Sequence, residues 1–205
     1  CSKPEWGVFG EILLNNRPYT PRDPAAAIKH GIGLLPEDRK QQGLALQLSV
    51  AKNINMGGYN PIASLGFINL GKERAVADQY VQKLTIRTPA VTQKVGLLSG
   101  GNQQKVVVGR WLNRGSKVFI FDEPTVGVDV GAKAEIYRLL EELIKQGDSI
   151  IIVSSYLPEV MGLSDRIVVL REGRQMGIVE RKDFNDELLL QYATALKSDA
   201  APANA

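Results

Sequence analysis

Residues 117–155, KVFIFDEPTVGVDVGAKAEIYRLLEELIKQGDSIIIVSS, decide the fold class of this chain. The segment starts with the apolar run KVFIF (117–121) and closes with the apolar run SIIIVSS (149–155), both of strand length. Between them, AKAEIYRLLEELIKQG (132–147) has helical periodicity and stops at a glycine. Its apolar stripe comprises Ile136, Tyr137, Leu140, Leu143 and Ile144. A strand, a helix and a second strand in this order predict a parallel sheet with helices on its faces.

The flanking segments extend this α/β pattern. Short strands are predicted at VFGEILL (8–14) and IGLL (32–35), on either side of the proline-marked turn RPYTPRDP and a helix capped by Asp23. After the central segment, REGR joins RIVVL (166–170) to QMGIVE as a hairpin. From about residue 36 to residue 95 the signals are helical and loop-like, with Ser49 as a helix cap. We therefore predict a helical insertion in an α/β domain.

The bulk composition is that of an ordinary globular protein. The chain has 205 residues, 44% of them hydrophobic and 23% charged, with a net charge of +3. No basic run suggests a nucleic-acid partner, and no apolar run is long enough to span a membrane. A single cysteine, Cys1, excludes an internal disulfide framework. Because the sequence begins with this cysteine, we expect it to be part of a longer chain.

The stretch GFINLGKE (66–73) imitates a phosphate-binding loop of the form G-x-x-x-x-G-K-[ST], with Glu73 in place of the hydroxyl residue. A true P-loop follows a buried strand and precedes a helix whose N–H groups surround the phosphates. The residues before this stretch, MGGYNPIASL, have two adjacent glycines and a proline, which is typical of a loop. We interpret the stretch as a surface loop that opens the helix KERAVADQYVQKL.

The stretch LLSGGNQQKVVVGRWL (97–112) is the strongest candidate for anion binding. Ser99, Gly100 and Gly101 stand immediately before a helical run. Two glycines and a hydroxyl at this place expose free N–H groups and the positive end of the helix dipole, which suits a nucleotide γ-phosphate. A plain serine cap with a glycine turn is the alternative.

A second candidate is VFIFDEP (118–124), in which a buried strand ends in Asp122 and Glu123. The carboxyl ends of parallel strands form the edge at which ligands bind in open α/β folds. In such a site the first carboxylate can reach Mg²⁺ and the second can polarise an attacking water. A turn enforced by Pro124 is the alternative, although a turn does not require both acids.

Taken together, LSGGNQQKV, FIFDEPTVGVDVGAKAEIY and IIIVSSYLPEV resemble the nucleotide-binding domain of ABC transporters in order and spacing. PEDRKQQGL and DVGAKAEIY more narrowly resemble the C-terminal half of the duplicated ATPase subunit of bacterial monosaccharide importers. The resemblance covers about residues 8–190 and implies a P-loop NTPase fold, α/β with a parallel sheet, that is incomplete at its N-terminus. The implied parts are an ATPase core (1–36 and 98–186), a helical subdomain (37–97), and a C-terminal helix with a disordered tail (187–205).

The resemblance also assigns roles to individual residues. The signature that would contact ATP in trans comprises Leu98, Ser99, Gly100, Gly101, Asn102 and Gln103, with Asn102 where glutamine is usual. Asp122 matches the Walker B aspartate, which holds Mg²⁺ through water, and Glu123 matches the catalytic glutamate. Asp129 matches the D-loop aspartate. The implied cofactors are therefore ATP and Mg²⁺.

Three elements of the family pattern are absent. No Walker A motif (the family's P-loop) occurs in the 205 residues; in the family it would precede residue 1, so we expect the sheet to lack the strand that carries it. The Q-loop position holds Glu37 rather than glutamine, and the switch position holds Ser155 rather than histidine. Serine cannot supply the protonatable contact that an imidazole provides. The site at this chain's own Walker B residues is therefore expected to bind nucleotide more than it hydrolyses it.

The family's domain pairing suggests a different task for this chain. Each ATP in the family lies between the Walker A motif of one domain and the signature of the other. The resemblance therefore implies that the signature here completes the ATP site of the N-terminal half of the same subunit, in a sugar importer at the cytoplasmic face of the bacterial inner membrane. Further implied partners are two permease subunits and, indirectly, a periplasmic sugar-binding protein. The alternatives are a soluble ABC-type ATPase module and a non-functional gene remnant.

Overall fold

The computed structural model describes residues 11–20, 22–58, 62–64 and 67–194. The α-helices are α1 (Pro24–Lys29), α2 (Val50–Asn55), α3 (Leu70–Lys83), α4 (Gly100–Arg114), α5 (Val130–Lys145), α6 (Leu157–Leu163) and α7 (Asp186–Thr194). The strands are β1 (Leu13–Leu14), β2 (Arg17–Pro18), β3 (Ile32–Leu35), β4 (Ala63–Ser64), β5 (Phe67–Ile68), β6 (Val118–Asp122), β7 (Ser149–Val153), β8 (Arg166–Arg171) and β9 (Arg174–Glu180). Shorter helical turns are η1 (Arg39–Gly43), η3 (Val95–Leu97) and η4 (Arg181–Asp183).

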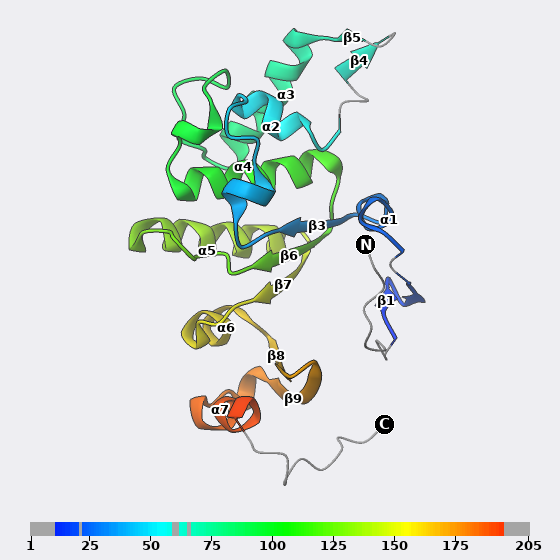
Figure 1. Cartoon of the computed structure of the whole chain (residues 1–205), viewed down its shortest axis with the longest axis vertical. Helices are drawn as coiled ribbons and strands as arrows, with labels where there is room; N and C mark the ends of the chain where they lie inside the picture. Colours follow the sequence, from blue (N-terminus) through cyan, green and yellow to red (C-terminus); the bar gives the residue numbers. More distant parts are fainter. Residues whose placement is uncertain (1–10, 21, 59–61, 65–66, 195–205) are drawn as a thin grey trace.

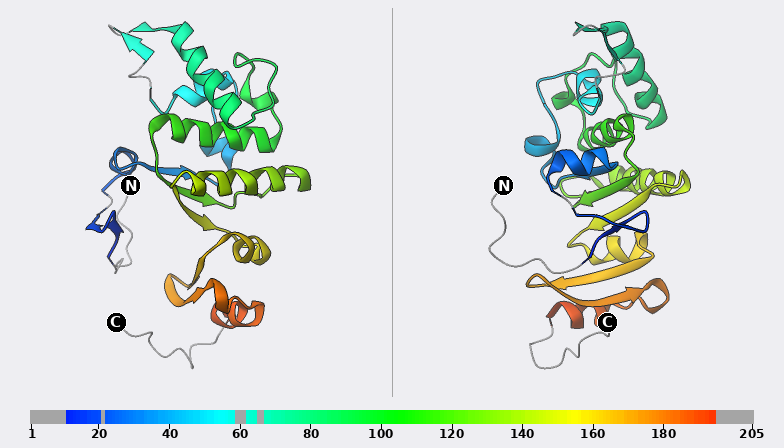
Figure 2. Two further views of the ribbon diagram at one scale, coloured as in Figure 1. Left: turned by 180° about the vertical axis from the view of Figure 1, so that it is seen from behind. Right: turned by 90° about the vertical axis from the view of Figure 1, so that its right-hand side faces the viewer.

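These elements lie in successive layers along the long axis of the molecule. Helices α2, α3 and α4 form one end, the sheet with α5 lies in the middle, and β8, β9 and α7 form the other end (Figure 1). The same order is visible from behind and from the side (Figure 2). Within the described residues, no helix is both long enough and apolar enough to cross a bilayer.

The central sheet confirms the predicted parallel arrangement. Its strand order is β3-β6-β7, with all neighbours parallel. The side chains of Leu35, Phe119 and Phe121 lie on one face of the sheet and are fully buried. They pack in a core with residues of α4 and α5. Burial of each such side chain contributes on the order of 2 kcal/mol. The core is therefore shared by the sheet and the two helices that begin beside the candidate site.

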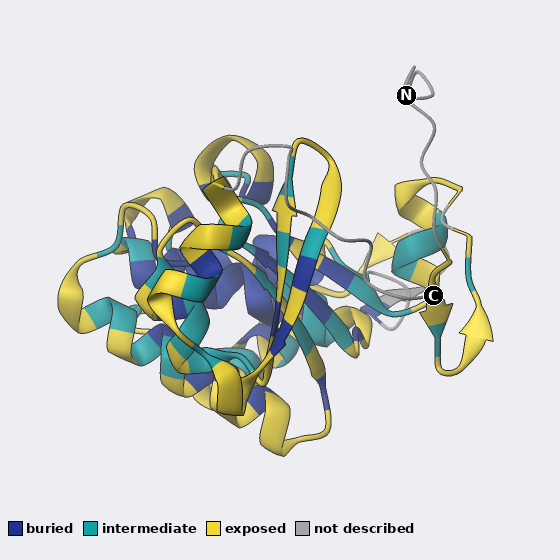
Figure 3. Cartoon of the chain, turned by 90° about the horizontal axis from the view of Figure 1, so that it is seen from below, coloured by how far each residue is buried: buried dark blue, intermediate teal, exposed yellow. Residues whose placement is uncertain are grey.

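The opposite face of the sheet is incompletely covered. Leu34, Ile151 and Val153 are about half exposed on this face, although parallel sheets are normally covered on both sides. In Figure 3, buried and more exposed residues alternate along strands of the molecule. Among the described residues, no strand pairs with the outer edge of β7, because β8 pairs antiparallel with β9 instead. The predicted β8–β9 hairpin is thus confirmed. The outer edge of β7 has no strand partner among the described residues.

The N-terminal part differs from the sequence prediction. Arg17 and Pro18, which we predicted within a turn, form β2 and pair antiparallel with β1. The reversal occurs at Asn15 and Asn16, both with positive φ, which is the conformation of a tight hairpin turn that asparagine tolerates well. Only the last two residues of the predicted strand 8–14 lie in β1, and residues 8–10 are outside the described residues.

Helices α1, α2 and α5 each begin directly after a residue whose side chain caps the helix. Asp23 Oδ1 accepts from the Ala26 N–H at 2.7 Å and Ser49 Oγ accepts from the Lys52 N–H at 3.2 Å, so both predicted caps are confirmed. Helix α5 begins at Val130, two residues earlier than predicted, because Asp129 caps it. Its inner face also differs from the prediction: Leu139 is buried there, whereas Ile144 is about half exposed.

Within the stretch that imitates a P-loop, residues 67–73 form a short strand and the start of helix α3. Phe67 and Ile68 form β5, which pairs antiparallel with the two-residue strand β4 and is largely exposed. Helix α3 then starts at Leu70, capped by Asn69, two residues earlier than predicted. Among the residues that the structure describes, no buried parallel strand leads into this turn, which confirms the interpretation as a surface connection; Gly66 lies outside the described residues.

Candidate functional site

The carboxyl ends of the three parallel strands bring several predicted residues to one edge of the sheet. Glu37 follows β3, and Ser155 follows β7. Asp122 is the last residue of β6, and Glu123 comes directly after it. Glu123 Oε1 accepts a 2.7 Å hydrogen bond from the Ser155 N–H, and the Glu123 N–H donates to the Val153 carbonyl at 2.8 Å. Glu123 has a φ of 45°, so its backbone is held in a conformation that non-glycine residues rarely adopt.

Asp122 offers an unpaired carboxylate at this edge of the sheet. Its carboxylate is half-buried at the end of β6 and forms no hydrogen bond or ion pair with any described residue. Mg²⁺ at nucleotide sites is usually held by one or two carboxylates together with waters and phosphates. No group of three or more His, Cys, Asp or Glu residues that could hold a metal ion gathers among the described residues.

The start of α4 presents unpaired donors. Ser99 is exposed at the N-cap, and its hydroxyl makes no capping bond to the helix backbone. Instead, Ser99 Oγ accepts from Asn102 Nδ2 at 2.8 Å, while Asn102 Oδ1 accepts from the Arg87 N–H at 2.8 Å. The Arg87 N–H fixes which end of the Asn102 amide faces Ser99. The Ser99 hydroxyl proton is not used in this bond, so it can be donated to a further acceptor, as can the free N–H groups of the first turn.

Packing requires glycine at position 101, and a side chain at position 100 would displace the end of Arg39. A Cβ on Gly101 would lie 2.9 Å from the Ala132 Cβ in the first turn of α5, and a Cβ on Gly100 would lie 2.6 Å from Arg39 Nη2. Neither glycine has a positive φ, and both lie in the first turn of α4. The glycines let the start of α4 approach α5 and Arg39 closely.

The remaining signature residues face inward. Leu98 is buried in the core. Gln103 is 3% exposed, and its Nε2 donates to the Val95 carbonyl at 3.3 Å. The Gln103 side chain therefore packs inside the helical part, and its contact with ATP stays a prediction.

Asp129 connects this helix start to the turn after β6. Its Oδ1 accepts from the Ala132 N–H at 3.0 Å and caps α5, while the residue itself is exposed. Because Ala132 also contacts Gly101, the D-loop position and the signature lie side by side.

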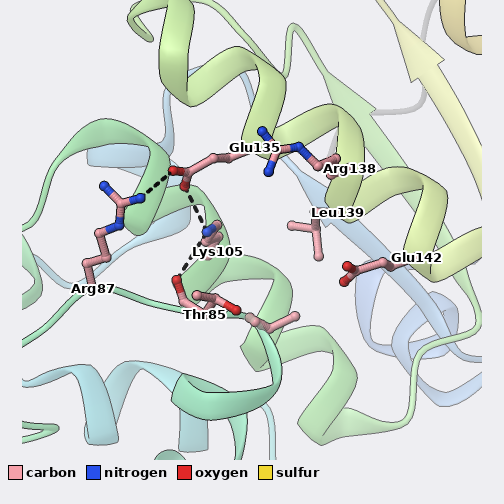
Figure 4. Close-up of a pocket in the computed structure, with 8 residues that line it drawn as sticks. Thr85, Arg87, Lys105, Glu135, Arg138, Leu139 and Glu142 are labelled. Carbon is pink, nitrogen blue, oxygen red and sulfur yellow. Dashed lines mark hydrogen bonds and ion pairs between the residues drawn. The ribbon is translucent and has the colours of Figure 1, made fainter.

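An ion cluster that the sequence analysis missed joins α4 to α5 (Figure 4). The Lys105 side chain is 6% exposed, and its Nζ lies 2.9 Å from Glu135 Oε2 and 3.1 Å from the Thr85 carbonyl. Arg87 Nη2 lies 3.0 Å from Glu135 Oε1. The Lys105 hydrogen bond, with the nearby Arg87 and Arg138 charges, lowers the pKa of Glu135. These contacts border a cavity of about 180 Å³ and tie the loop after α3 to both helices.

Comparisons with known proteins agree with this geometry. The family model described as ABC transporter matches residues 3–126. The ribose import ATP-binding protein RbsA 3 of Rubrobacter xylanophilus is 52% identical over 188 residues, which cover 92% of this chain and 38% of the relative. The putative ribose/galactose/methyl galactoside import ATP-binding protein 3 of Burkholderia cenocepacia is 51% identical over 186 residues, covering 90% and 36%. The chain thus spans less than two fifths of the length of these relatives.

Solved structures share the fold. A nucleotide-free ATP-binding cassette from an ABC transporter superposes with a TM-score of 0.71 at 22% identity, covering 90% of this chain and 76% of that one. The cbiO1 protein of Clostridium perfringens, part of the cbiONQ ABC transporter complex, gives a TM-score of 0.69 at 26% identity, covering 89% and 70%. The α/β fold with a parallel sheet and a helical part is therefore that of ABC cassettes.

Proposed function

Because this chain belongs to the ABC transporter family, we propose that it is a nucleotide-binding domain of an ATP-driven sugar importer and that it donates its signature to an ATP site completed by a partner domain. The observation that carries this proposal is the exposed start of α4. There, the Ser99 hydroxyl accepts from Asn102 and keeps its own proton for another acceptor, next to the unpaired N–H groups of the first turn. Such donors at a helix N-terminus stabilise phosphate charge.

The edge formed by the strand ends is proposed to bind nucleotide more than it hydrolyses it. The Glu123 carboxylate accepts from the Ser155 N–H, and Glu37 adds a further acid after β3. When bound, Mg²⁺ would neutralise phosphate charge, with Asp122 accepting a hydrogen bond from one of its waters. The chain's contribution to hydrolysis would then come from α4 rather than from Glu123.

The proposed partners follow from the relatives and from the open sheet. The relatives are named import ATP-binding proteins and are more than twice as long as this chain. We propose the N-terminal half of the same subunit as the direct partner, together with two permease subunits and, indirectly, a periplasmic sugar-binding protein. The complex would lie at the cytoplasmic face of the bacterial inner membrane. The half-exposed Leu34, Ile151 and Val153 on the sheet support a covering element from outside the described residues.

The proposal is tested by combining the chain with a separately expressed N-terminal half and measuring ATP hydrolysis. We expect the mixture to hydrolyse ATP and the chain alone to be inactive. Glu123→Gln should retain most of the activity of the mixture, within about threefold, because the productive site uses the partner's catalytic residues. A loss of about a thousandfold in Glu123→Gln would mean that hydrolysis occurs at this chain's own strand ends.

The orientation of Ser99 gives a second prediction. Asn102→Asp is isosteric and still accepts from the Arg87 N–H, but it replaces the donor to Ser99 by an acceptor. The Ser99 hydroxyl would then donate to this carboxylate and no longer to a phosphate, so we expect ATP hydrolysis by the mixture to fall about 100-fold.

The matched control is Asn69→Asp, at the cap of α3, where the side-chain oxygen accepts from the Lys72 N–H. This change should leave hydrolysis unaltered. Equal activity of Asn102→Asp and Asn69→Asp would exclude the proposed role of the Ser99 hydroxyl.

A further inference from the structure

Arg39 is a buried cation without an acidic partner. It begins the turn η1, two residues after Glu37, and is 8% exposed. Its guanidinium forms no ion pair with any described carboxylate, and its Nε is buried without a hydrogen bond. Burial lowers the pKa of Arg39, and the nearby Asp38 only partly opposes this effect. Keeping a charge in such a place costs free energy that an apolar side chain would not require.

The guanidinium lies where three segments meet. Nη1 donates to the Val126 carbonyl at 3.2 Å, and Nη2 donates to the Gly127 carbonyl at 3.4 Å. Nη2 also lies close to the start of α4, because a Cβ added to Gly100 would be only 2.6 Å from it. One side chain thus contacts the turn after β3, the turn after β6 and the start of α4.

The chemistry of arginine suits this junction. Two successive carbonyls can each receive an N–H from one planar guanidinium, whereas the single ammonium group of lysine is a poorer match to that spacing. The Asp38 side chain caps the same turn by accepting from the Lys40 and Gln41 N–H groups at 3.0 Å. The Asp38 cap therefore fixes the backbone around Arg39, and the Arg39 side chain extends from there to the turn after β6.

We propose that Arg39 is a positioning residue that holds the turn at Val126 and Gly127 against Gly100, so that the D-loop and the signature meet the partner's nucleotide as one unit. The effect on ATP hydrolysis rests on the proposed function, whereas the hold of Arg39 on the turn does not.

Hydrogen exchange of the chain, measured without partner or nucleotide, tests the structural part. The N–H groups of Val126 and Val128 donate within the turn. We expect their exchange to become at least tenfold faster in Arg39→Met, with Arg39→Lys between this variant and the wild type. The control is Arg110→Met, which removes bonds from Arg110 to the Asn53 carbonyl and Asn53 Oδ1 inside the helical part. Unchanged exchange at the turn in Arg39→Met, or equal acceleration in Arg110→Met, would overturn the proposal.

ATP hydrolysis by the mixture with the N-terminal half tests the catalytic part. We expect Arg39→Met to lower kcat about 100-fold with KM for ATP within threefold, since misplacement of a positioned group affects the transition state most. Arg39→Lys should recover part of kcat, and Arg110→Met should keep it. A wild-type mixture without activity would contradict the proposed function, while the exchange result would still decide whether Arg39 holds the turn. A rise in KM alone would overturn the positioning role.

Discussion

Ser99→Asp is expected to abolish ATP hydrolysis by the assembled pair while the chain stays at least as stable as the wild type. Ser99 is exposed at the N-cap of α4, where aspartate is an equally good cap and favours the helix dipole. The same carboxylate would lie where we propose the γ-phosphate to bind. It removes a hydroxyl donor and adds a repelling charge, so we expect a loss of at least about 1000-fold in kcat.

The control for this variant is Ser49→Asp, which makes the same change at the N-cap of α2. Thermal unfolding should show both variants to be as stable as the wild type, and only Ser99→Asp should lose hydrolysis. Full activity of Ser99→Asp would mean that no phosphate approaches the start of α4.

The second large effect concerns stability. Glu135→Gln should lower the free energy of unfolding by about 2–3 kcal/mol, because it leaves the buried Lys105 ammonium without its carboxylate. Lys105→Met combined with Glu135→Gln should recover most of this loss, since the unpaired charge is then gone. Chemical denaturation measures both differences.

Glu141→Gln is the matched control for Glu135→Gln. Glu141 is on the same helix, and its Oε2 lies 3.8 Å from Lys145 Nζ in an exposed pair. Such pairs contribute about 0.5 kcal/mol or less. Equal destabilisation by Glu141→Gln and Glu135→Gln would contradict the special role of the Lys105–Glu135 pair.

The same pair gives a dependence on pH. The Glu135 pKa is lowered in the folded state, chiefly by Lys105, with Arg87 and Arg138 adding to the effect. A lowered carboxyl pKa contributes stability above the ordinary value of 4.5, and this contribution is lost as the pH falls below that value through the folded-state pKa. We therefore expect the stability difference between wild type and Glu135→Gln to shrink as the pH is lowered from 6 towards 3 (roughly the range set by the ordinary carboxyl pKa).

Local patterns explain why much of this fold could be predicted. The strand ending in Asp122 is a continuous apolar run, and the caps Asp23 and Ser49 immediately precede helical segments. The hairpin at β1 and β2 was missed because only two residues form each strand, so no alternation could develop. Paired asparagines at its turn were the available signal.

The contacts that build the site could not be predicted in the same way. Arg39 bonds to a carbonyl 87 residues away, and Lys105 bonds to a carboxylate 30 residues away. Local periodicity carries no information on such distant pairs, and both residues have a type that is usually exposed. The packing role of Gly101 likewise depends on Ala132, which lies on another helix.

Disulfide crosslinking tests the central claim most directly. The sequence contains one cysteine, so Ser99→Cys in a Cys1→Ser background offers a single thiol. It would be oxidised against a cysteine placed in the phosphate-binding loop of the N-terminal half, with ATP present and Mg²⁺ withheld. Our account predicts a crosslink that requires ATP and that Ser49→Cys does not form. A failure to crosslink with ATP, or equal crosslinking of both variants, would contradict donation of the signature to the partner's nucleotide.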